Sequence, residues 1–94
     1  MIILRSTYVA DVVALQAHLE AHLRWVDAGY KRGWFIASGL RDGGVGAAIL
    51  AQGVEIDEIR DFLEEDPFVR NAVSEYDVIE FEAARTVAEL ASFS

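Results

Sequence analysis

The 94-residue sequence contains no cysteine, which excludes disulfides, thiolate nucleophiles and cysteine-ligated metal centres. Positive charge is scarce, because 8 Lys and Arg stand against 16 Asp and Glu and leave a net charge of −8. Such a protein repels a phosphate backbone, so we expect no nucleic-acid partner. The longest apolar run, 45–51, is too short to cross a bilayer, and the apolar start of the chain is too short for a signal-peptide core. We therefore expect a cytoplasmic protein with no membrane partner.

The composition that remains is that of a globular protein. Hydrophobic residues make up 53% of the chain and charged residues 26%, which rules out a disordered chain and, at this length, predicts a single domain over 1–94. The acidity is uneven, since residues 51–94 carry twelve acidic and three basic side chains. Such an excess of acidic side chains is typical of a solvated helix face that keeps a protein soluble, and an acidic docking surface is the alternative.

Residue periodicity and turn signals predict the secondary structure. Leucines recurring at three- and four-residue steps indicate an amphipathic helix that Asp11 caps and Gly33 ends, with a buried stripe through Leu19 and Leu23 to Tyr30. The chain as a whole is predicted to form strands at 2–9, 34–40, 45–52 and 75–82, helices at 12–32 and 56–65, a short helical segment to about 72, and a terminal helix at about 86–91. Gly43, Gly44 and Gly46 lie between two strands, which favours a hairpin over a phosphate-binding loop.

The element order is β-α-β-β-α-β, which predicts an α+β, ferredoxin-like fold with two helices on one face of a four-stranded antiparallel sheet. The second and third strands are apolar at nearly every position, a pattern typical of strands covered on both faces. Two helices cover only one face. We therefore expect a homodimer in which the open sheet faces of two copies pack together.

Two titratable residues stand out as candidates for chemistry. His22 interrupts the apolar stripe of the first helix, and imidazole is the common side chain that accepts and donates protons near neutral pH. A satisfied core histidine is the alternative. Asp66 precedes Pro67 and is predicted to cap a helix, where the N-terminus stabilises an anion. It would accept a hydrogen bond from a histidine N–H better than it would donate a proton.

Two further patterns in the sequence could support other chemistry. His18 and His22 are four residues apart, a spacing that can hold a metal, but a third ligand is missing and no metal is expected. Ser38 and Gly39 end the second strand, where glycine allows a ligand or a backbone to approach closely or eases the bend into the hairpin. No nucleophile elbow surrounds Ser38, so a nucleophilic role is not predicted.

Four short motifs carry a family resemblance: Ala21-His22-Leu23, Gly33, Ala37-Ser38-Gly39 and Asp66-Pro67-Phe68-Val69. Over about residues 2–82 the chain resembles the YciI-like (YCII-related) domain family of the dimeric α/β-barrel superfamily. The resemblance implies a ferredoxin-like homodimer with a pocket in which His22 and Asp66 form a catalytic pair lined by Ser38 and Gly39. Some members of the family are linked to dehalogenation of chlorinated hydroxyquinones. Leu40 stands where the family usually has proline, and the hairpin is shorter, so no substrate is transferred.

Two functions remain open at this point. In the first, the protein is a small enzyme of the lyase, isomerase or dehalogenase type. His22 would act as general acid and base on a small aromatic or oxygenated metabolite, Asp66 would orient it, and Phe68 and Trp25 would form pocket wall. No cofactor is expected. In the second, the same pocket of a dimeric module binds a small ligand without reaction.

Overall fold

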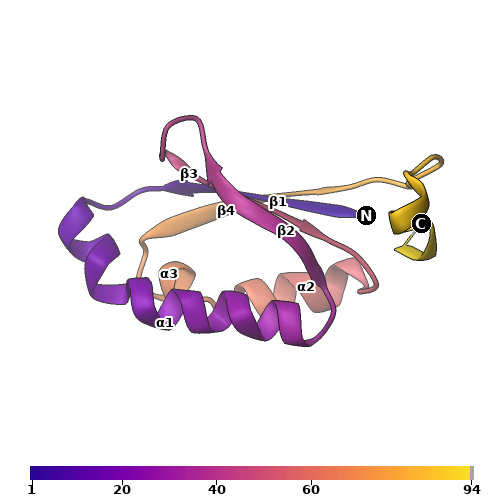
Figure 1. Cartoon of the computed structure of the whole chain (residues 1–94). Helices are drawn as coiled ribbons and strands as arrows, with labels where there is room; N and C mark the ends of the chain where they lie inside the picture. The colour runs from indigo at the N-terminus through magenta and orange to yellow at the C-terminus, as the bar shows by residue number, and fades with distance from the viewer. Residues whose placement is uncertain (94) are drawn as a thin grey trace.

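The computed structural model describes residues 1–93, and its elements follow the predicted order within one or two residues for the strands and the two longer helices. Figure 1 shows the chain from its N-terminal strand to its C-terminal segment. The elements are β1 (Ile2–Tyr8), α1 (Val12–Lys31), β2 (Phe35–Arg41), β3 (Gly46–Ala51), α2 (Ile56–Leu63), α3 (Pro67–Arg70), β4 (Ser74–Glu80) and η1 (Ala88–Phe93).

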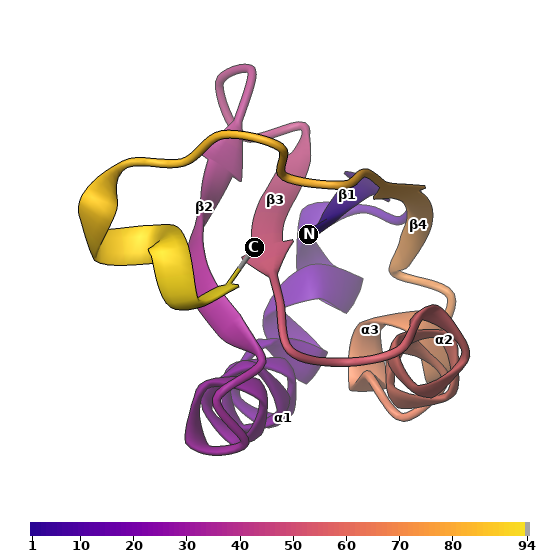
Figure 2. The same cartoon turned by 90° about the vertical axis from the view of Figure 1, so that its right-hand side faces the viewer.

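The four strands form one antiparallel sheet in the order β2-β3-β1-β4. At its centre Leu4 of β1 pairs with Ile49 of β3 on one side and with Val78 of β4 on the other. The three α-helices lie on one face of this sheet, with α1 below β2 and β3 and with α2 and α3 beside it (Figures 1 and 2). The predicted ferredoxin-like fold is therefore confirmed.

The first helix and the hairpin begin and end with the caps and turns that the sequence predicts. The carboxylate of Asp11 accepts the backbone N–H of Ala14 at 3.0 Å and begins α1. Gly33 follows the helix with φ of 75°, a left-handed conformation that glycine adopts without steric cost. Asp42 and Gly43 also have positive φ and turn the chain between β2 and β3. These caps and turns bring the ends of α1 and of the hairpin to defined places on the sheet.

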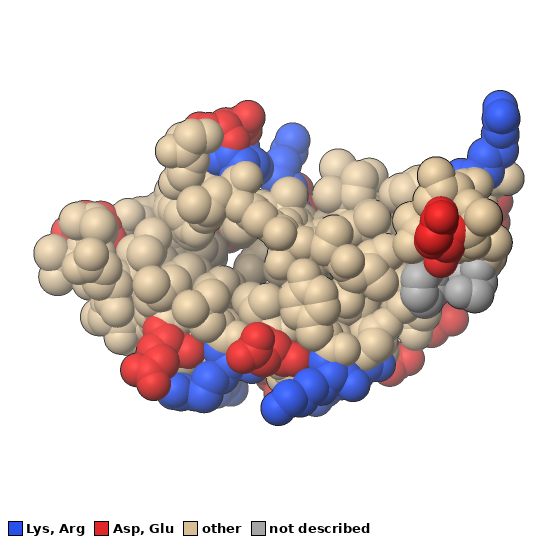
Figure 3. All heavy atoms as spheres, in the orientation of Figure 1, with Lys and Arg blue, Asp and Glu red and all other residues tan. Residues whose placement is uncertain are grey.

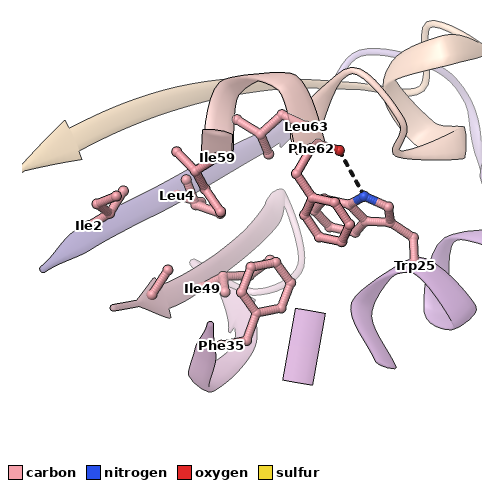
Figure 4. Close-up of a cluster of buried hydrophobic side chains, with 9 residues drawn as sticks. Ile2, Leu4, Trp25, Phe35, Ile49, Ile59, Phe62 and Leu63 are labelled. Atoms are coloured by element: carbon pink, nitrogen blue, oxygen red, sulfur yellow. Dashed lines mark hydrogen bonds between the residues drawn. The ribbon is translucent and has the colours of Figure 1, made fainter. Parts of the chain in front are cut away.

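The core lies between the sheet and the helices, and its aromatic part is built around Trp25 of α1 (Figure 4). The indole packs on the ring of Phe62, with centroids 4.8 Å apart, and its Nε1 donates a hydrogen bond to the backbone oxygen of Phe62 at 2.9 Å. This bond satisfies the one polar atom of a buried side chain. The buried members of the cluster are Ile2, Leu4, Trp25, Phe35, Ile49, Ala51, Ile59, Phe62 and Leu63.

The face of α1 that is buried differs from the predicted stripe. Leu19, Leu23 and Tyr30 are 37%, 51% and 41% exposed, whereas the buried residues of the helix are His22, Trp25 and Gly29. Compared with the prediction, the helix is rotated about its axis, so that the polar His22 and the small Gly29 face the sheet together with Trp25. The reason is the close approach of α1 to the sheet, because the ring of Phe35 occupies the place where a Cβ on Gly29 would stand.

The opposite face of the sheet has no helix over it (Figure 2). Strand residues alternate between the two faces, so Ile3 and its register partners Leu50 and Ile79 point away from the core. The terminal helix lies at Ala88–Phe93 and is a 3₁₀ helix, where the sequence predicts a helix at 86–91. Within residues 1–93 no helix has both the length and the apolar character needed to cross a membrane.

Candidate functional site

The site centres on a hydrogen bond between His22 of α1 and Asp66, which immediately precedes α3. Nδ1 of His22 lies 2.8 Å from Oδ1 of Asp66, although the two residues are 44 positions apart in the chain. The His22 side chain is 11% exposed and the Asp66 side chain is fully buried. An aspartate carboxylate only accepts hydrogen bonds, so this contact assigns the hydrogen to Nδ1 and leaves Nε2 as the second nitrogen of the ring.

Asp66 is held by three donors from three elements. Its Oδ1 accepts the N–H of Phe68 at 2.9 Å as well as the His22 bond, and its Oδ2 accepts the hydroxyl of Tyr76 at 2.8 Å. The first bond caps α3, which begins with Pro67 as the sequence indicates. Because both oxygens are satisfied in a buried place, the carboxylate has little freedom to rotate and fixes the orientation of the imidazole.

Two aromatic rings hold the imidazole plane. Phe68 stacks on His22 with ring centroids 4.0 Å apart and an angle of 3° between the planes. Trp25 lies farther away, at 5.9 Å. Both rings were expected as pocket wall, but the structure places both in the interior, with Phe68 1% and Trp25 6% exposed, and neither is among the residues that line the cavity described next. Phe68 therefore contacts the imidazole itself, and Trp25 belongs to the core.

A cavity of about 190 Å³ lies between α1 and the sheet, and His22 is part of its wall. In the space-filling view an opening is visible between the helix and the strands, away from the charged side chains along the helical edge (Figure 3). The wall is lined by Tyr8, Leu19, His22, Leu23, Val26, Ser38, Gly39, Leu40, Ala47, Ile49 and Tyr76. The set contains no Lys, Arg, Asp or Glu. The leucines that proved to be exposed on α1 thus form the rim of this cavity.

Ser38 and Gly39 are brought to the same cavity by β2. The hydroxyl of Ser38 lies 2.7 Å from the hydroxyl of Tyr30, so the serine is held by a residue of α1. Gly39 has open space where a Cβ would stand, and its φ is not in the left-handed range. The backbone conformation therefore does not require glycine at this position, and nothing obstructs a Cβ there.

Two residues of the site, Tyr8 and Tyr76, were missed by reasoning from the sequence. Tyr76 is on the inner side of β4, the face that it shares with Ser74 and Val78. Residues two apart in a strand lie on the same face, and this period was the signal that could have placed Tyr76 in the site. Burial raises the pKa of the Tyr76 hydroxyl well above its usual value, and the nearby charge of Asp66 and their hydrogen bond raise it further. Tyr76 is therefore a neutral donor to Asp66 at any physiological pH.

The described part of the chain offers no cluster for a metal. Within residues 1–93 no group of three or more His, Asp and Glu side chains could hold a metal ion. The chemistry available at the site is that of an oriented imidazole whose Nε2 makes no hydrogen bond to any described residue, beside a mostly apolar cavity. Such a group can accept a proton from a bound molecule or return one to it.

The fold and the oriented imidazole define a ferredoxin-like α+β domain with a small-molecule cavity. The model of the YCII-related domain matches residues 1–82, and the chain belongs to this family. A search of curated proteins gives no match. Among solved structures, the chain is similar to the 5-chloro-2-hydroxyhydroquinone dehydrochlorinase of Burkholderia phenoliruptrix AC1100 in complex with 2,5-dihydroxybenzoquinone. The TM-score is 0.67 at 18% identity, with 87% of this chain and 94% of that chain covered. At this identity the likeness supports the fold.

Proposed function

We propose that the protein is a small-molecule enzyme in which His22 transfers protons to and from a ligand held in the cavity. The observation that carries the proposal is the hydrogen bond of Nδ1 to a buried carboxylate, at 2.8 Å, in a histidine at the cavity wall whose other nitrogen has no partner among residues 1–93. Within residues 1–93, the side-chain polar atom that is fully buried without a partner is Oγ of Ser74, so Nε2 of His22 is open to the cavity, where a ligand can reach it.

In this mechanism Nε2 of His22 removes a proton from an O–H or C–H group of the ligand. The imidazolium that forms is stabilised by the Asp66 carboxylate, which stays in place because Tyr76 and the N–H of Phe68 hold it. The same nitrogen then returns the proton to a different atom of the ligand. Base catalysis by a positioned side chain typically contributes about 10²–10⁴ in rate. Asp66 is a positioning residue here and does not itself exchange the proton.

The size and polarity of the cavity define the class of ligand. A cavity of about 150 Å³ in another protein binds benzene, so the 190 Å³ found here accommodates one six-membered ring with small substituents. The wall carries no charged side chain apart from protonatable His22, which favours a ligand that is neutral when it enters. An oxygenated single ring meets both conditions. The molecule bound by the structural neighbour, 2,5-dihydroxybenzoquinone, is also an oxygenated single ring.

The experiment that tests the proposal measures proton exchange, so that it does not depend on knowing the natural substrate. The probe is 1,3-dihydroxybenzene in D₂O at neutral pH, followed by NMR. Removal of an O–H proton and delivery of deuterium to a ring carbon gives the keto tautomer, and loss of hydrogen from that carbon restores the aromatic ring with one deuterium. We expect the wild type to accelerate this exchange, His22→Gln to abolish the acceleration, and Asp66→Asn to reduce it at least tenfold.

Two outcomes decide against the enzymatic proposal. If the probe binds without accelerated exchange, the cavity of a non-catalytic binding module is the better description. If His22→Gln exchanges as fast as the wild type, the imidazole is not the base. Chloride release from 5-chloro-2-hydroxyhydroquinone, the compound in the name of the structural neighbour, further tests whether the proton transfer is coupled to dehydrochlorination.

We also propose that two copies form a homodimer through the open sheet face. This face presents Ile3, Leu50 and Ile79 in register across three strands, beside a shallow hollow of about 300 Å³ that reaches β2. Sedimentation should show a dimer for the wild type and a monomer for Leu50→Glu. The control is Val13→Glu, which changes an exposed residue of α1 and should remain dimeric. A monomeric wild type at micromolar concentration contradicts the proposal. A cytoplasmic location also stays a prediction of the sequence.

A further inference from the structure

Tyr8 is the last residue of β1 and shares the cavity wall with His22. Its ring meets the ring of Phe68 edge-on, with centroids 6.0 Å apart and an angle of 89° between the planes. The same Phe68 ring stacks face to face on His22. One buried phenylalanine therefore positions both the imidazole and the phenol, so the two polar groups have a fixed relation to each other.

The hydroxyl of Tyr8 differs from those of the other two tyrosines. Tyr30 and Tyr76 each hydrogen-bond a side chain, Ser38 at 2.7 Å and Asp66 at 2.8 Å. The hydroxyl of Tyr8 makes no hydrogen bond to any residue that the structure describes, although the residue is half-buried. The hydroxyl is not sealed in the interior, so it can bond to a molecule that enters the cavity. At the wall of a cavity, that partner can be the ligand.

We propose that Tyr8 is the second polar contact of the site, and that its hydroxyl donates a hydrogen bond to one oxygen of the ligand while His22 takes the proton from another group. The inference rests on the proposed function, because it concerns the same cavity. It adds a requirement that His22 alone does not impose: the ligand carries an acceptor oxygen as well as an acidic proton. Tyr8 is thus a specificity-determining residue.

The charge state of Tyr8 suits this role. Burial raises the pKa of the Tyr8 hydroxyl above its ordinary value, and the negative charge of Asp66 raises it further. The phenol therefore keeps its hydrogen at neutral pH. The Tyr8 hydroxyl is available to the ligand, because the nearby carboxylate of Asp66 is already occupied by the hydroxyl of Tyr76, the imidazole of His22 and the N–H of Phe68.

The test compares ligands that contain or lack the acceptor. The probes are the three isomers of nitrophenol and the three isomers of methylphenol, which share the O–H group and one ring. Affinities are measured by calorimetry for the wild type and for Tyr8→Phe, which keeps the ring that contacts Phe68. We expect Tyr8→Phe to weaken at least one nitrophenol about tenfold and to change its methylphenol counterpart less than twofold. Differences in phenol acidity cancel, because each probe is compared with itself in the two proteins.

The control is Thr7→Val at the neighbouring, exposed position of β1. It removes a hydroxyl that accepts a hydrogen bond from Arg41 at 2.6 Å and does not line the cavity, so all six affinities should stay unchanged. Equal effects of Tyr8→Phe on both series would overturn the inference, because no bond to the acceptor would then exist. Failure of all six phenols to bind the wild type would also overturn it. In either case the deuterium exchange of the wild type and of His22→Gln decides the proposed function separately.

Discussion

Replacing Asp66 with alanine removes the acceptor of three hydrogen bonds in a fully buried place, and we expect a large loss of stability. The bonds are those from His22, Phe68 and Tyr76, at 2.8, 2.9 and 2.8 Å. Loss of the helix cap alone costs about 1 kcal/mol. Each of the other donors stays buried without a partner, at about 1–3 kcal/mol. We expect Asp66→Ala to lower the free energy of unfolding by about 3–7 kcal/mol, a large part of the about 5–15 kcal/mol typical of a domain.

The matched variant Asp66→Asn separates the loss of charge from the loss of the acceptor. Asparagine is an equally good helix cap. Its oxygen can still accept from His22 and Phe68, and its amide can donate to the hydroxyl oxygen of Tyr76. We therefore expect a loss of only about 1 kcal/mol for this variant. It also keeps the test informative if the alanine variant fails to fold.

The assay is urea unfolding at pH 7, followed by far-UV circular dichroism. With a slope of about 1–3 kcal/mol per molar urea, the expected loss moves the midpoint of Asp66→Ala by at least about 1 M. The control is Asp11→Ala, which removes an exposed cap with one bond, from the N–H of Ala14 at 3.0 Å, and should cost about 1 kcal/mol. If Asp66→Ala is no less stable than Asp11→Ala, the buried carboxylate does not organise the site and the reasoning is wrong.

Three further predictions follow from single contacts. The raised pKa of Tyr76 means that the folded protein keeps a proton that the unfolded chain loses above about pH 10. The contribution of Tyr76 to the free energy of unfolding is therefore complete below that pH and falls as the pH rises above it. In urea unfolding, we expect the free energy of unfolding of Tyr76→Phe to fall by about 1 kcal/mol less than that of the wild type between pH 10 and 11. Gly29→Ala should destabilise by about 1–3 kcal/mol, because the new Cβ meets the ring of Phe35, and Gly39→Ala, with open space at its Cβ, should not; equal midpoints in thermal unfolding would contradict this. Ala72 has φ of 55°, so Ala72→Gly should raise the stability by up to about 1 kcal/mol, and a lower melting temperature would show that no strain is stored there.

The secondary structure was largely readable from the sequence because its signals act between near neighbours. The Asp11 cap, the Asp66-Pro67 helix start and the turn at Gly43 and Gly44 each depend on hydrogen bonds or backbone angles within a few residues, and the structure shows all of them. The element order then left the ferredoxin-like arrangement as the simple way to cover one face of the sheet, and the family motifs pointed to the same fold.

The face of α1 that packs on the sheet could not be read in the same way. A helix with apolar residues on more than one side has several faces to bury, and the choice depends on how closely the sheet approaches. Gly29 fixes the buried face of α1, because its missing Cβ leaves space for the ring of Phe35. With this face buried, Trp25 packs in the core, and Leu19 and Leu23 line the cavity. Periodicity reports that a helix has an apolar side, but the space available between layers is a property of the whole packing.

For the site, residue type and motif were sufficient to nominate His22 and Asp66, since an imidazole and a helix-capping carboxylate have recognisable chemistry. Only the tertiary structure decided that they meet at 2.8 Å across 44 residues and that Tyr76 completes the set of donors to the carboxylate. It also decided that the hydroxyl of Tyr8, at the cavity, has no hydrogen-bond partner among the residues that the structure describes. Those relations are set by strand register and by the packing of α1 against α3. Neither is encoded within a short stretch of chain, because each depends on which distant surfaces the folded protein brings into contact.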